Sequence, residues 1–125
     1  MRVDKMNDLI RRGTVTNINY KEGTVKIVQE DRDDAVSFDL PLLSFEYNPP
    51  EIGDMVLAVF LDNTQGFILG KPFNENNIPK HGDKNIIRKD YDVDAYIEYD
   101  KNTKTLIIKA ENIVVQGNFT RDGET

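Results

Sequence analysis

Apolar and polar residues alternate along much of this chain, and the alternation has the two-residue period of β-strands. The longest apolar run, residues 55–60 (Met-Val-Leu-Ala-Val-Phe), is too short for an ordinary helix and long enough for a strand. A second run, residues 67–69, follows a turn in which Gly66 is expected to take a positive φ. The two runs predict a hairpin whose first strand is buried on both faces.

The segment before this hairpin predicts three more strands. Residues 13–20 and 23–29 are rich in β-branched side chains and flank a short turn, so they predict a first hairpin. After a charged turn at residues 30–34, Val36, Phe38 and Leu40 alternate with polar residues, which predicts a third, half-buried strand. Five short antiparallel strands favour a small closed barrel of the OB type over residues 13–74.

The two segments that flank the predicted barrel have different patterns. In residues 1–12, Met6, Leu9 and Ile10 share a helical face and Gly13 is placed to end the helix, which predicts a short N-terminal helix or arm. Residues 75–90 are rich in Asn, Lys, Pro and Gly, which is typical of a linker.

Alternation returns in residues 91–125 and predicts three further strands, at residues 92–99, 105–110 and 113–119. A small isolated sheet is only marginally stable in water, so these strands need a partner surface, either the barrel or copies of the same chain. Copies of the chain could provide this surface around a rotation axis that buries the same apolar row from each chain. In that case, the residues expected to line the interior are Val93, Ala95, Ile97, Leu106, Ile108, Ile113 and Val115.

Composition narrows the classes of function. The chain has 125 residues and no cysteine, which removes disulfides and thiol catalysis. Its net charge of −6 argues against a surface built to neutralise nucleic-acid phosphates. No apolar run approaches the roughly 20 residues of a membrane span, and the N-terminus lacks the apolar core of a signal peptide. We therefore expect synthesis and assembly in the cytoplasm.

Candidate chemical sites are weak. The acidic turn at residues 30–34 is more typical of a charged hairpin turn than of a calcium site. Asp90, Asp92 and Asp94 mark the solvated face of a strand, and His81 has no catalytic partner at a recognisable spacing, which is typical of a solvated loop histidine. We expect a protein that is not an enzyme and has no catalytic residue, metal or cofactor.

Several motifs together resemble the phage baseplate assembly protein V family, the central spike proteins of contractile tails, which are related to the spike of type VI secretion. The resemblance rests on G-T-V-x-x-I from Gly13, V-K-I-V at residues 25–28 and S-F-D-L-P-L-L at residues 37–43. It rests above all on P-E-I-G-D-M-V-L-A-V-F at residues 50–60 with G-F-I-L-G at residues 66–70. Residues 13–74 carry it well and residues 90–119 more loosely.

The resemblance implies an OB barrel that leads through a linker into a trimeric β-helical or β-prism stalk. Such a homotrimer would sit in the baseplate of a phage or phage-like (bacteriocin) particle, bind tail hub proteins and contact the target cell envelope transiently as a membrane-puncturing needle. Many members end in a His-x-His motif that binds iron, whereas the only histidine here is His81, so a separate spike-tip protein or a shorter needle is expected. The alternative is an OB-fold protein that binds single-stranded nucleic acid as a monomer or dimer.

Overall fold

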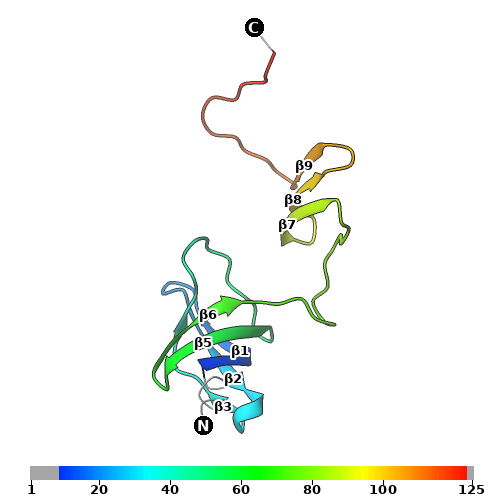
Figure 1. The fold of residues 1–125 in the computed structure, drawn as a ribbon. Helices are drawn as coiled ribbons and strands as arrows, with labels where there is room; N and C mark the ends of the chain where they lie inside the picture. Colours follow the sequence, from blue (N-terminus) through cyan, green and yellow to red (C-terminus); the bar gives the residue numbers. More distant parts are fainter. Residues whose placement is uncertain (1–8, 124–125) are drawn as a thin grey trace. The chain divides into compact units, whose positions relative to one another are not determined.

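The protein is all-β and consists of two compact units, as seen in a computed structural model that describes residues 9–123 (Figure 1). The units are Met1–Asn77 and Ile78–Thr125. Each unit forms its own antiparallel sheet, and a short 3-10 helix, η1 (Glu30–Arg32), accompanies the strands of the first. Across the described residues no helix is long and apolar enough to cross a membrane.

The first unit holds a six-stranded sheet in which β1 occupies the middle. Its strands are β1 (Ile10–Asn19), β2 (Thr24–Gln29), β3 (Ala35–Val36), β4 (Leu40–Pro41), β5 (Met55–Asp62) and β6 (Gln65–Gly70). The pairing order is β3-β2-β1-β5-β6, and β4 pairs with β2 as well. The β1–β2 and β5–β6 hairpins confirm the two hairpins predicted from the sequence. The hydrogen-bonded ladder ends at β3 and β6, so the strands of residues 9–77 do not form a closed barrel.

The core of the first unit lies against one face of this sheet. Phe60 is central to it: the ring of Phe38 meets its ring edge-on at 5.7 Å, and the guanidinium of Arg11 lies 4.0 Å from its ring centre. Burial alternates along β5, because Met55, Leu57 and Val59 are only half-buried. The strand is therefore fully buried on one face, whereas the sequence predicted burial on both. The fully buried apolar residues are Val15, Val25, Ile27, Leu40, Val56, Ala58, Phe60 and Ile68.

Gly66 is not the turn residue with a positive φ that the sequence predicted. It does not have a positive φ and lies within β6, where it pairs with Phe60. A Cβ atom at this position would stand 2.5 Å from the carbonyl oxygen of Val59 and 3.3 Å from Leu40 Cδ2. The glycine therefore allows the close approach of β5, β6 and β4 rather than a turn.

The predicted third strand is divided into β3 and β4. Ser37, between them, is buried, whereas Val36, which the alternation predicts to be inside, is exposed. The Ser37 hydroxyl accepts a hydrogen bond from the backbone N–H of Ile27 at 3.0 Å and donates to the carbonyl of Phe38 at 2.8 Å. The strand is interrupted because this hydroxyl replaces a backbone partner of β2.

The predicted N-terminal helix does not extend to residue 12. Residues 1–8 lie outside the described part of the chain, and β1 already begins at Ile10. Residues 10–12 pair with residues 57–59 of β5, so tertiary pairing outweighs the helical pattern of Leu9 and Ile10.

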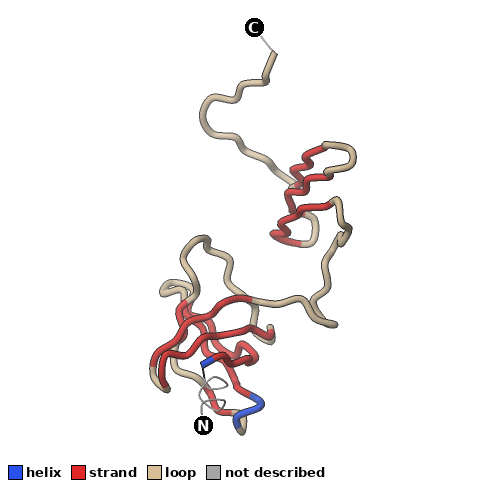
Figure 2. The backbone as a smooth tube through the Cα atoms, viewed as in Figure 1, coloured by secondary structure: helices blue, strands red, loops and turns tan. Residues whose placement is uncertain are grey.

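The second unit holds a three-stranded sheet in the order β7-β8-β9, formed by β7 (Ile86–Asp92), β8 (Ala95–Asp100) and β9 (Thr105–Lys109). β8 and β9 correspond to the first two strands predicted for this region. β7 lies mainly within residues 75–90, which the composition had assigned to a linker. Residues 113–119, predicted as a third strand, form none and follow β9 as loop (Figure 2).

The close approach at Gly66 generates a prediction about stability. Gly66→Ala should destabilise the first unit by about 1–3 kcal/mol, because the new methyl group must displace backbone at Val59. Thermal or urea unfolding would measure the loss. Gly82→Ala is the matched control, since its Cβ would meet only side-chain atoms of Pro79, at 3.3 and 3.6 Å. Equal stability of the two variants would contradict this account.

Candidate self-association surface

The register of the second sheet places apolar side chains on one of its faces. Ile97 of β8 lies directly opposite Ile108 of β9, and Tyr99 lies opposite Leu106 on β9 and Ile87 on β7. Because paired residues share a face, these five side chains form one surface, called here the apolar face.

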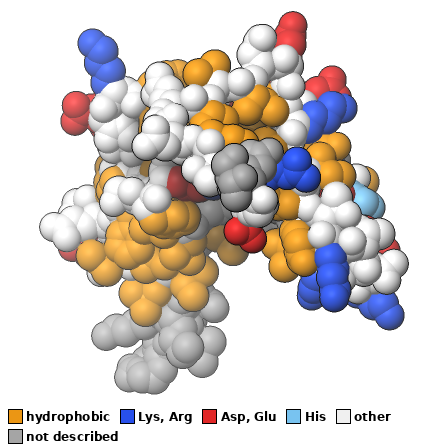
Figure 3. Space-filling model, turned by 90° about the horizontal axis from the view of Figure 1, so that it is seen from above, with side chains coloured by type: hydrophobic (Ala, Val, Ile, Leu, Met, Phe, Trp, Pro, Cys, Tyr) orange, Lys and Arg blue, Asp and Glu red, His pale blue; other side chains and the backbone are white. Residues whose placement is uncertain are grey.

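The apolar face is uncovered in this chain. Ile87 is 61% exposed, Leu106 57%, Ile108 55% and Ile97 36%. Figure 3 shows exposed hydrophobic side chains lying among charged ones over the surface of the chain as seen from above. Lys89, opposite Ile97, also belongs to this face, and its ammonium group lies 5.5 Å from the ring centre of Tyr91. Contiguous exposed apolar surface of this kind marks sites of interaction.

The structure brings together four of the seven residues predicted for a stalk interior. Ala95, Ile97, Leu106 and Ile108 share the apolar face, although Ala95 is half-buried. The other three lie outside the strands: Val93 is in the turn between β7 and β8, and Ile113 and Val115 follow β9. All three are exposed.

Ile87 and Tyr99 belong to the apolar face but are missing from the predicted interior. Ile87 lies within the segment read as a linker, where Asn, Lys and Gly outnumber apolar residues. The pair Ile86–Ile87, ahead of alternating Arg88 and Asp90, was the signal that could have located β7.

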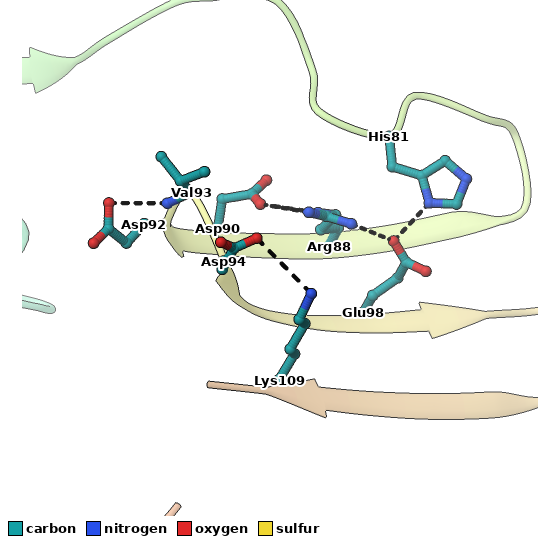
Figure 4. A network of polar contacts seen from close by, with 8 residues as sticks. All are labelled: His81, Arg88, Asp90, Asp92, Val93, Asp94, Glu98 and Lys109. Carbon is teal, nitrogen blue, oxygen red and sulfur yellow. Dashed lines mark hydrogen bonds and ion pairs between the residues drawn. The ribbon is translucent and has the colours of Figure 1, made fainter. Parts of the chain in front are cut away.

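The opposite face of the second sheet, called here the polar face, carries a cluster of ion pairs (Figure 4). The Arg88 guanidinium contacts Glu98 Oε1 at 2.7 Å and Asp90 Oδ1 at 2.9 Å. His81 Nδ1 lies 2.7 Å from the same oxygen of Glu98. His81 and Asp90, expected to be solvated, are thus both engaged in this cluster.

These contacts favour the charged forms of Glu98 and Arg88. The hydrogen bond from Arg88, followed by that from His81, lowers the pKa of Glu98 although burial opposes the shift. Hydrogen bonds to Asp90 and then to Glu98 raise the pKa of Arg88. Glu98 and Arg88 are therefore both ionised at neutral pH.

Aromatic stacking completes the polar face. The guanidinium carbon of Arg88 lies 3.7 Å from the ring centre of Tyr96, and the Lys109 ammonium lies 5.9 Å from the same centre. Lys109 also pairs with Asp94 at 3.8 Å. The charged groups of the polar face thus find partners within the chain, whereas the apolar side chains of the opposite face remain exposed.

Nothing in the described residues suggests a metal centre: residues 9–123 contain no group of three or more His, Asp or Glu side chains able to hold an ion. The sequence matches no protein-family model, and a comparison with curated proteins found no match. The apolar face is thus the candidate site with the clearest physical basis.

The Glu98 cluster should make the second unit sensitive to acid. Because the folded-state pKa of Glu98 is depressed, its contribution to stability is present above its ordinary value of 4.5 and is lost as the pH falls through the lower folded value. NMR amide signals of β8 would follow the transition. Glu98→Gln should flatten this pH dependence below 4.5, whereas Glu22→Gln, in an exposed turn of the first unit, should leave it unchanged. If the stability of Glu98→Gln depended on pH in the same way as that of the wild type, Glu98 would not be the source of the acid sensitivity.

Proposed function

We propose that this protein is a structural, non-enzymatic subunit: the homotrimeric central spike or hub protein of a contractile phage tail or phage-like particle. The observation that carries the proposal is the uncovered apolar face of the second sheet. The motifs at residues 50–60 and 66–70, which resemble those of baseplate spike proteins, supply the biological context.

Self-association follows from the limits of a three-stranded sheet. Such a sheet is marginally stable when one apolar face remains in water. Burying apolar surface contributes about 25 cal/mol per Å², so covering Ile97, Leu106 and Ile108 with the same residues of other copies is favourable. A closed threefold arrangement lets each copy bury the same row.

The segment after β9 would extend this assembly. Ile113 and Val115, like Val114 between them, are exposed and lie in no strand. In the proposed trimer this segment continues a β-helical or β-prism stalk, with Ile113 and Val115 facing the axis. Strand pairing between copies would then satisfy the backbone groups that the single chain leaves open.

The first unit would attach the spike to its partners. Its order β3-β2-β1-β5-β6, with a long connection between β4 and β5, is compatible with an OB-type barrel in which β4 lies against β6 without pairing. Tail hub and baseplate proteins are the proposed partners of this unit. A separate spike-tip protein is a further candidate partner of the stalk, which would contact the cell envelope during contraction.

A pair of neighbouring substitutions tests the assembly. Wild-type protein should have a molar mass three times the 14.3 kDa of one chain in light scattering. Ile108→Lys should reduce it to that of a single chain, because an ammonium group cannot be buried unpaired on the axis. Ile107→Lys, on the polar face opposite Glu98, should still assemble. A wild-type monomer, or identical behaviour of both variants, would refute the proposal.

Binding of nucleic acid separates the proposal from its alternative. With a net charge of −6, the protein should not retain single-stranded DNA in a low-salt filter-binding titration. Affinity that falls with rising salt, in a monomeric or dimeric protein, would instead favour an OB-fold nucleic-acid binder.

A further inference from the structure

Residues 78–85, called here the strap, lead into β7 and are fastened to the second sheet at two points. In the middle of the strap, His81 Nδ1 meets Glu98 Oε1 at 2.7 Å. At its end, the carbonyl of Asn85 accepts a hydrogen bond from the backbone N–H of Lys101 at 2.8 Å. Figure 4 shows the His81 ring above the sheet, directed at Glu98.

The two fastenings differ in kind. The end of the strap is held by backbone geometry, since the Asp83 carboxylate accepts from the N–H of Asn85 at 2.9 Å and the Asp83 carbonyl from the N–H of Ile86 at 3.1 Å. These contacts do not depend on a histidine. The middle is held by His81 alone among the side-chain contacts described for the strap, and half of this side chain is exposed to solvent.

The cluster that receives His81 has an uneven charge. Glu98, only 5% exposed, and Asp90 contribute two carboxylates, whereas Arg88 contributes one guanidinium. A protonated His81 would balance the four groups. A neutral His81 leaves one negative charge in excess at a site where water has little access to Glu98.

We propose that His81 is a proton-dependent latch, which holds the strap on the polar face when protonated and loosens it when neutral. Histidine is the side chain that changes its charge between about pH 5 and 8. The ionised state of Glu98, favoured by its lowered pKa, persists across that range. Mild acid therefore closes the strap, and only stronger acid disrupts the cluster beneath it.

The other charged groups near His81 do not reverse the direction of this pH dependence. Arg88 of β7 repels an imidazolium, but its guanidinium is already bound to Glu98 and Asp90. Lys80 and Lys84 on the strap are exposed and oppose the charge of Asp83 between them. Glu98 of β8 remains the group in direct contact with His81.

The latch sets how much of the strap is held on the second sheet. With the latch closed, the strap is fixed from His81 onward; with it open, it is fixed only from Asp83 onward. The inference holds whether or not copies of the chain associate, so its failure would not affect the proposed function.

Hydrogen–deuterium exchange of the full chain tests the latch, with rates corrected for the intrinsic pH effect. Strap amides should be protected about two- to fivefold more near pH 5.5 than near pH 8, the range expected for a partly exposed ion pair. His81→Gln should bring this ratio to about one. Since His81 is the only histidine in the chain, no other imidazole can produce the effect.

Lys84→Gln is the matched control, because it removes a strap charge without touching the cluster, and it should keep the wild-type ratio. The amides of β2 in the first unit should show no pH effect in any variant. A wild-type ratio of one, a ratio that persists in His81→Gln, or its loss in Lys84→Gln would each overturn the proposal.

Discussion

In the second unit, the chain satisfies the side chains on only one of the two faces of the sheet. On the polar face, Glu98 and Arg88 satisfy each other and the strap lies across them. On the apolar face, Ile97 and Ile108 form a cross-strand pair that remains in water. The first unit differs because it has a buried core around Phe60, although it also exposes apolar side chains such as Phe45, Ile52 and Leu61. The proposed function depends on this difference between the units.

Local alternation predicted the hairpins well, because each joins two strands across a short turn and needs only nearby residues. Long-range packing decided the rest. Gly66 looks like a turn residue in the sequence, but its neighbours across the sheet are Val59 and Leu40. Ser37 interrupts a strand because its hydroxyl bonds to β2, a contact between residues ten positions apart. Periodicity contains no information about either contact.

Of the two faces of the second sheet, the sequence predicted part of the apolar one and none of the ion-pair cluster on the other. Leu106, Ile107 and Ile108 form an apolar run, so a strand rich in apolar side chains could be predicted from the sequence, but the run does not show that Ile107 faces the other side. The ion-pair cluster could not be predicted, because His81 and Glu98 are 17 residues apart and an acidic residue on a strand ordinarily faces water. β7 was obscured by the polar composition around Ile86 and Ile87.

The self-satisfied polar face also bears on how large an assembly can grow. A sheet with two adhesive sides can stack without limit, as in fibrils. Here, the charges of Arg88 and Glu98 are already paired with each other, so a second layer placed against them would gain no new ion pair. Stacking on the polar face is therefore not favoured, and the association proposed above is confined to the opposite face of the sheet.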